Sequence, residues 1–133
     1  MSEYCRAILY VDDDEDDQAL FSAAMRQLSP TTEIIQARNG LEALNYLNTG
    51  TGHSGLPNLI VLDLNMPVLD GRETFERLRL NPELRGIPTV IFSSSLNPND
   101  KVLFKSQGAE FISKPNDYSQ LSRLASEMLG LCA

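Results

Sequence analysis

Short apolar runs alternate with longer amphipathic segments along this chain. The runs have the length and composition of buried β-strands, and those at 59–62 and 89–92 are apolar on both faces, as central strands of a parallel sheet are. The run at 32–37 is the weakest and is predicted to be an edge strand. The five predicted strands are Ala7–Val11, Thr32–Ala37, Leu59–Leu62, Thr89–Phe92 and Glu110–Ile112.

Apolar residues at helical spacing between these runs predict five helices. The stripes are Leu20, Phe21, Ala24 and Leu28; Leu41, Leu44 and Leu47; Phe75 and Leu78; and Leu121, Leu124, Ala125 and Met128. The fourth helix is predicted to begin at Asn97-Pro98, a capping residue followed by proline. Five alternations of strand and helix predict one α/β domain, a flavodoxin-like (βα)5 fold with a doubly wound parallel sheet in strand order 2-1-3-4-5.

The composition is that of an ordinary globular protein, with 42% apolar and 22% charged residues in a chain of 133. Residues 1–133 are therefore expected to form one domain, and the 18 residues after Pro115 suffice for one helix and no output domain. The net charge of −7 comes almost entirely from six consecutive acids at 12–17. Such a chain has no electrostatic attraction for nucleic acid or an anionic membrane.

The N-terminal residues do not have the pattern of a signal peptide, so a cytoplasmic location is expected. Cys5 and Cys132 lack the spacing of a zinc site or a disulfide scaffold. The first strand begins and the last helix ends at the same end of the predicted sheet, so the two cysteines are expected to lie near each other. Reduced thiols are the prediction, because cytoplasmic disulfides are rare.

Polar residues follow four of the five predicted strands. Asp12 and Asp13 follow the first strand, Asp63 the third, Ser93 the fourth and Lys114 the fifth. Ligands of such sheets bind at the carboxyl ends of the strands, so the three aspartates should converge there. Clustered carboxylates need a counter-charge, and oxygen ligands favour Mg²⁺, or Mn²⁺ in its place. A lysine and a hydroxyl group opposite the metal suit a phosphoryl group, with Asp63 as the nucleophile.

These residues resemble a known family, the receiver domains of bacterial two-component response regulators. The resemblance rests on five motifs: Val11-Asp12-Asp13-Asp14, Leu62-Asp63-Leu64-Asn65-Met66-Pro67, Asp70-Gly71, Ile87-Pro88 through Ser93-Ser94-Ser95, and Lys114-Pro115. The finer wording of the first two motifs is similar to short standalone receivers, some of which pair with phytochrome-type sensor kinases. The resemblance implies a phosphoprotein that switches between two states, not an enzyme that turns over a substrate.

The resemblance also implies roles for the acidic residues. Asp63 would take a phosphoryl group from the phosphohistidine of a sensor histidine kinase. Asp13 and Asp63 would bind Mg²⁺ directly, Asp12 mostly through water, and Asn65 through its backbone carbonyl. Phosphorylation would then signal to a downstream protein target.

Three further residues receive switch roles from the same resemblance. Lys114 would pair with the phosphoryl oxygens, next to a Lys114–Pro115 bond that is often cis in this family. Ser93 would be the switch hydroxyl, in place of the more common threonine. Phe111 would be the aromatic switch residue, where tyrosine is frequent, and its ring needs no hydroxyl group to change rotamer.

An interaction face is predicted from a wide apolar segment. Val102-Leu103-Phe104 spans more of a helix than one buried stripe requires, so at least one of these side chains should point outward. The predicted face includes Phe104, Phe111 and Tyr118, and its occupant would be a partner protein or a second copy of the chain.

Other interpretations were weighed against these. Asp16 and Asp17 are interpreted as solvated acids at a helix start, and the acid run lacks the glycine of a calcium loop. The segment Gly50-x-Gly52-x-x-Gly55, which contains His53, precedes a strand and does not fit a dinucleotide site. A haloacid-dehalogenase-like phosphatase would need an acid where Asn65 stands. A phosphorylation-independent scaffold of the same fold stays open.

Overall fold

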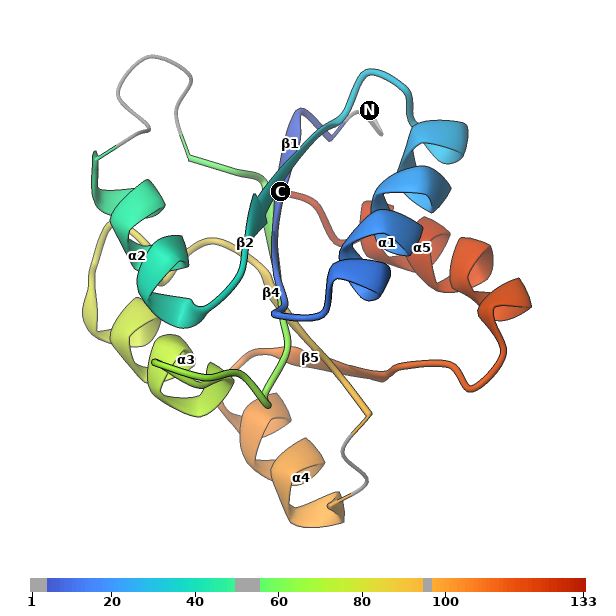
Figure 1. Cartoon of the computed structure of the whole chain (residues 1–133). Helices are drawn as coiled ribbons and strands as arrows, with labels where there is room; N and C mark the ends of the chain where they lie inside the picture. Colours follow the sequence, from blue (N-terminus) through green and yellow to red (C-terminus); the bar gives the residue numbers. More distant parts are fainter. Residues whose placement is uncertain (1–4, 50–55, 95–96) are drawn as a thin grey trace.

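The computed structural model describes residues 5–49, 56–94 and 97–133 (Figure 1). Its strands are β1 (Ala7–Val11), β2 (Glu33–Ala37), β3 (Leu59–Leu62), β4 (Thr89–Ser93) and β5 (Glu110–Ser113). Its helices are α1 (Glu15–Leu28), α2 (Gly40–Thr49), α3 (Gly71–Leu80), α4 (Pro98–Ser106) and α5 (Leu121–Leu129), with a short 3₁₀ helix, η1 (Tyr118–Gln120). The glycine segment with His53, and Ser95, lie outside the described residues.

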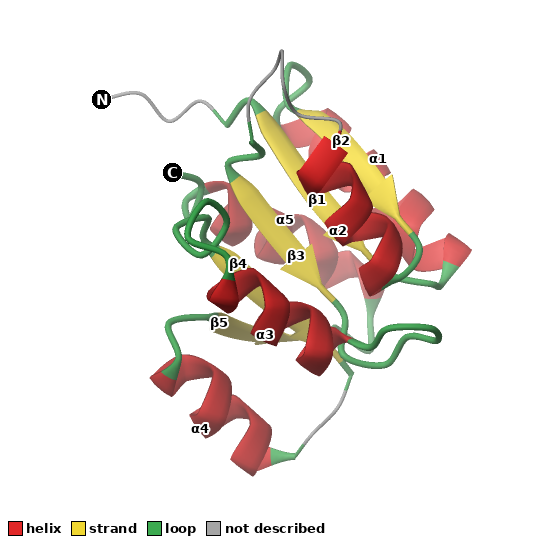
Figure 2. Cartoon of the chain, turned by 90° about the vertical axis from the view of Figure 1, so that its left-hand side faces the viewer, coloured by secondary structure: helices red, strands yellow, loops and turns green. Residues whose placement is uncertain are grey.

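The five strands form one parallel sheet in the order β2-β1-β3-β4-β5, which confirms the predicted topology (Figure 2). Helices α2, α3 and α4 cover one face of the sheet, and α1 and α5 cover the other. The predicted fourth helix begins as expected, because Asn97 caps α4 and accepts a hydrogen bond from the Asn99 N–H.

Two cores lie on the two faces of the sheet because side chains alternate along each strand. In β1, Leu9 and Val11 contact the core under α2, α3 and α4. Ile8 and Tyr10 contact the other core, under α1 and α5. Strands β1, β3 and β4 are buried along their whole length, whereas β2 lies at one edge of the sheet and has Ala37 as its buried residue. The prediction of β2 as an edge strand is therefore confirmed.

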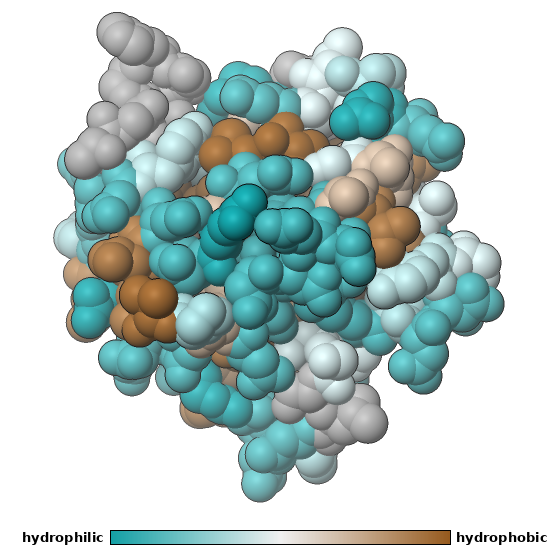
Figure 3. Space-filling view, in the orientation of Figure 1, coloured by the Kyte–Doolittle hydropathy of each residue, from teal (hydrophilic) through white to brown (hydrophobic). Residues whose placement is uncertain are grey.

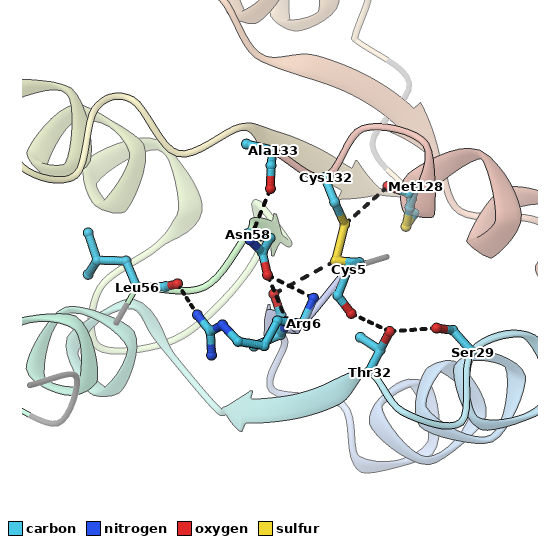
Figure 4. The surroundings of a disulfide bond; sticks show 10 residues. Cys5, Arg6, Ser29, Thr32, Leu56, Asn58, Met128, Cys132 and Ala133 are labelled. Carbon is cyan, nitrogen blue, oxygen red and sulfur yellow. Dashed lines mark hydrogen bonds between the residues drawn. A yellow bond between two sulfur atoms is a disulfide. The ribbon is translucent and has the colours of Figure 1, made fainter. Parts of the chain in front are cut away.

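Cys5 and Cys132 form a disulfide in the structure (Figure 4). Their Cα atoms are 5.8 Å apart, as a disulfide requires, because β1 begins and α5 ends at the same end of the sheet. The predicted proximity is confirmed, and the predicted reduced state is wrong for this structure. Asn58 joins the two ends of the chain near this disulfide, because its side chain accepts hydrogen bonds from the Arg6 and Ala7 N–H groups and donates one to the Ala133 carbonyl.

The apolar segment of α4 divides between core and surface. Phe104 is 2% exposed, whereas Val102 is 69% and Leu103 46% exposed. The Phe104 ring packs edge-on against Phe75 at 5.5 Å between centroids. The placement of Phe104 on an interaction face is therefore wrong, because this side of α4 faces the sheet and its neighbours face solvent. The expectation that one of the three points outward is confirmed.

Apolar side chains reach the surface in separate patches on the face seen in Figure 1, with hydrophilic residues between them (Figure 3). Within the described part of the chain, no helix has the length and hydrophobicity that crossing a membrane requires.

Candidate functional site

The topology of the sheet brings three aspartates together. β1 and β3 are neighbours, with Val11 paired to Leu62, so the residues that follow them lie side by side. One carboxylate oxygen each from Asp12, Asp13 and Asp63 lie within 4.8 Å of one another. The structure thus places these three predicted site residues in one cluster at the carboxyl edge of the sheet.

Asp63, like Asp12, is a buried carboxylate of this cluster. The residue is 7% exposed, and burial is the main reason that the pKa of its carboxyl group rises to about 6. The nearby Asp12 carboxylate raises the pKa further. The Lys114 amine, the Asn65 backbone N–H and the Ser93 hydroxyl act in the opposite direction and lower it.

Both oxygens of Asp12 already have partners. Its Oδ1 accepts from the Asp14 N–H at 3.0 Å, and its Oδ2 accepts from the Tyr10 hydroxyl at 2.9 Å and from the Lys114 amine at 2.8 Å. Asp13 is exposed. The direct role of Asp13 and the water-mediated role of Asp12 toward a cation stay predictions.

Lys114 lies between three carboxylates. Its Nζ is 2.8 Å from Asp12 and 2.8 Å from Asp17, but 3.6 Å from Asp63. Burial alone would lower the pKa of this amine, but its hydrogen bonds to Asp12 and Asp17 outweigh burial, and the pKa is raised. The interpretation of Asp17 as a solvated acid is therefore wrong, because its side chain is 17% exposed and paired with Lys114.

The two predicted switch residues have different exposure. Ser93, the last residue of β4, is fully buried and its hydroxyl contacts the Asp63 carboxylate. Phe111 is partly buried, with its ring 6.4 Å from that of Phe104. No cis peptide bond occurs in the described residues, so the Lys114–Pro115 bond is trans, in contrast to the cis form that the resemblance suggested.

Sequence reasoning missed two residues that support the cluster. Tyr10 was read only as part of an apolar strand, yet its hydroxyl reaches Asp12 while its ring stacks on Phe21 at 4.2 Å. Gln18 is buried, and its Nε2 donates to the backbone carbonyls of Asp12 and Ala37, which joins the ends of β1 and β2. The position of Gln18, next to the apolar stripe of α1, is the sequence feature that could have indicated a buried polar side chain.

A cavity of about 320 Å³ opens beside the cluster. Asp12, Asp13, Asp63 and Lys114 form its polar wall, and Phe21, Phe92 and Leu121 form its apolar wall. Tyr118, which is 54% exposed, also lines this cavity. The predicted face residues Phe104 and Tyr118 thus do not share one exposed patch.

The donor set fits a divalent cation. Three carboxylates lie within 4.8 Å of one another, two of them buried, and among the residues that the structure describes the amine of Lys114 forms ion pairs with two of them, Asp12 and Asp63. An ion with a preference for oxygen ligands would stabilise the ionised Asp63 carboxylate against burial and against the nearby Asp12 carboxylate, the two causes that raise its pKa. The residues present can therefore hold such an ion and, next to it, an anionic group that reaches Lys114.

Comparison with known proteins gives a consistent match. Residues 8–126 match the response regulator receiver domain family. The chain is 36% identical over 99 residues to response regulator Rcp1 of Synechocystis sp., covering 73% of this chain and 67% of that protein.

Two solved structures are similar over most of the chain. The phosphorylated cyanobacterial phytochrome response regulator RcpA has a TM-score of 0.84 and 31% identity, covering 93% of this chain and 91% of its own. The Mn²⁺-bound form of Rcp1 has a TM-score of 0.82 and 30% identity, covering 92% and 90%.

Proposed function

We propose that Asp63 is the phosphoryl acceptor of this chain, which belongs to the response regulator receiver domain family. Receiver domains act as phosphoacceptor switches and interact with sensor histidine kinases in two-component signalling. The observation that carries the assignment is the position of Asp63. It directly follows the central strand β3, within 4.8 Å of Asp12 and Asp13, and 3.6 Å from the Lys114 amine.

Asp63 would act as a nucleophile on a phosphorylated histidine. A carboxylate oxygen of Asp63 attacks the phosphorus, an O–P bond forms, the N–P bond breaks, and the histidine nitrogen keeps the electron pair. With a pKa of about 6, most Asp63 side chains are ionised at neutral pH and able to attack. The Asn65 N–H and the Ser93 hydroxyl keep the carboxylate oriented.

The neighbouring residues would balance the charge of the transferred group. Lys114 pairs with a phosphoryl oxygen, because its amine already lies within 3.6 Å of Asp63. Asp13 and Asp63, which lie in the carboxylate cluster, and the Asn65 carbonyl would hold Mg²⁺, or Mn²⁺, and Asp12 would act through water. When bound, the cation supplies positive charge to the phosphoryl oxygens. A Mn²⁺-bound structure of the similar protein Rcp1 supports this choice of ion.

Phosphorylation would then shift a conformational equilibrium. The phosphoryl group favours a state in which Ser93 stays turned toward Asp63 and Phe111 becomes fully buried beside Phe104. The surface of α4 and β5, with the exposed Val102 and Leu103, would carry the change to a downstream protein or to a second copy of the chain.

The partner kinase is proposed to be of the phytochrome type. The support is the similarity to RcpA, a cyanobacterial phytochrome response regulator. We also propose a single receiver domain over residues 1–133 and a cytoplasmic location. The Cys5–Cys132 disulfide runs against that location, because disulfides are rare in the cytoplasm.

Treatment with acetyl phosphate and Mg²⁺ tests the assignment of Asp63. Intact-mass measurement should show one added phosphoryl group, and EDTA should suppress it. Asp63→Asn should abolish the addition, whereas Glu76→Gln, which removes an exposed acid of α3, should leave it unchanged. Phosphorylation of Asp63→Asn would contradict the assignment. No phosphorylation of the unaltered chain would favour the scaffold, and multiple turnover of a phosphate ester would favour the phosphatase.

A further inference from the structure

Asp17 and Lys114 form a contact that the phosphoryl-transfer roles above do not use. The two residues are 97 positions apart, and the Asp17 carboxylate accepts a hydrogen bond from the Lys114 amine at 2.8 Å. Both side chains are mostly withdrawn from solvent, with 17% of Asp17 and 14% of Lys114 exposed. Solvent therefore screens this ion pair less than it screens a surface pair.

Asp17 differs in this respect from the other acids of the run at 12–17. Asp14 caps α1 and accepts from the N–H groups of Asp16 and Asp17. Asp16 is exposed. The cap fixes the first turn of α1, and this turn directs the Asp17 side chain to Lys114 and the Asp16 side chain to solvent.

We propose that Asp17 is a positioning residue that holds the Lys114 amine away from the phosphoryl acceptor Asp63. Asp17 would compete with a phosphoryl group on Asp63 for this amine. In the structure the amine hydrogen-bonds to Asp12 and Asp17 at 2.8 Å, while Asp63 is at 3.6 Å, beyond hydrogen-bond distance. A phosphoryl group on Asp63 would place new negative charge beside this amine. The Asp17 carboxylate pairs with the positive charge of the amine and repels the negative phosphoryl group. Asp17 therefore favours the unphosphorylated state.

The inference rests on the proposed role of Asp63, and a phosphoryl analogue tests it. Binding of beryllium trifluoride is followed by ¹⁹F NMR at saturating Mg²⁺, in the full chain. Asp17→Asn keeps the size of the side chain and removes its charge, and is expected to lower the dissociation constant by about 3- to 10-fold. Asp17→Glu restores the charge and should bring the constant back toward that of the unaltered chain.

Asp16→Asn is the matched control. It removes the same charge from the same helical turn, but from a side chain that is exposed. It should leave the dissociation constant unchanged within a factor of about 1.5, since it alters only the helix terminus and the net charge. Equal constants for Asp16→Asn and Asp17→Asn, or weaker binding by Asp17→Asn, would overturn the competition.

A second measurement does not depend on the phosphoryl analogue. An amine held by two carboxylates exchanges its protons slowly, so the Lys114 ammonium group should give a ¹H–¹⁵N signal. Asp17→Asn should remove or shift this signal, and Asp16→Asn should keep it. A signal that Asp17→Asn leaves unchanged overturns the positioning role. Failure of the unaltered chain to bind the analogue sinks the proposed function, whereas binding without any effect of Asp17 sinks this inference alone.

Discussion

Gly71, the first residue of α3, packs directly against the backbone of Asp63. A Cβ atom at position 71 would lie 2.2 Å from the carbonyl oxygen of Asp63 and 2.7 Å from the Cα of Leu64. The Gly71 N–H also donates to the Leu64 carbonyl at 3.0 Å. The start of α3 is thus held against the loop that presents the phosphoryl acceptor, and this close approach requires glycine.

Gly71→Ala should destabilise the fold by about 1–3 kcal/mol, because backbone atoms would have to move to admit the methyl group. Urea unfolding followed by circular dichroism measures the change. Gly86→Ala is the control, since a Cβ there meets nothing within 4 Å, and it should be neutral or stabilising by up to about 1 kcal/mol. Equal losses for the two variants would show that Gly71 is not constrained by Asp63.

The Cys5–Cys132 disulfide should contribute strongly to stability in the oxidised protein. It closes a loop across a sequence separation of 127, and a bond across so long a loop restricts the unfolded chain substantially. Reduction is expected to lower the free energy of unfolding by about 2–4 kcal/mol. Urea unfolding with and without a reductant measures this. The double variant Cys5→Ser, Cys132→Ser should not respond to the reductant, and identical midpoints for the oxidised and reduced chain would contradict the prediction.

Truncation of Phe104 should affect stability far more than truncation of its neighbour on the surface. Phe104 is 2% exposed and contacts the rings of Phe75 and Phe111, so Phe104→Ala is expected to cost about 3–5 kcal/mol. Val102 is 69% exposed, and Val102→Ala should change stability by at most about 0.5 kcal/mol. Chemical denaturation separates the two. If Phe104→Ala proves too unstable, Phe104→Leu should show a smaller loss of the same sign, and no loss in either would contradict the burial.

The acid cluster could be predicted from the sequence because topology alone determines it. Asp12 and Asp63 each follow a buried strand, and the strand order makes those strands neighbours, with Val11 paired to Leu62. The contact of Asp17 with Lys114 could not be predicted in this way. It depends on the residue at which α1 begins, and the Asp14 cap decides that.

The remaining differences have the same kind of cause. The rotation of α4 about its axis decides which of its three consecutive apolar residues faces the sheet. The sequence pattern shows only that at least one of the three points away from the sheet. The proximity of Cys5 and Cys132 follows from the topology, but the bond between them depends on redox conditions that the sequence does not state. The role of Tyr10 could not be predicted, because an aromatic ring is common in a buried strand whether or not its hydroxyl group donates to a carboxylate such as Asp12.

The pH dependence of stability should report the burial of Asp63. Its pKa is about 6 in the folded, metal-free protein and near 3.8 for an ordinary aspartate. Between these values the folded state binds more protons than the unfolded state, so stability falls as the pH rises from about 4 to about 7. The direction is opposite to that of an aspartate stabilised by an ion pair, because burial is the largest cause of this shift.

Asp63→Asn isolates this contribution from those of other groups. In EDTA, the free energy of unfolding of the unaltered chain minus that of Asp63→Asn should fall by about 1–3 kcal/mol between pH 4 and pH 7. Mg²⁺ should reduce this fall, because a cation bound only by the folded state stabilises the ionised carboxylate. Urea unfolding at several pH values measures the difference. A difference that stays constant, or that rises with pH, would mean that Asp63 ionises as easily in the fold as in the unfolded chain, and the enclosed acceptor site would not exist as described.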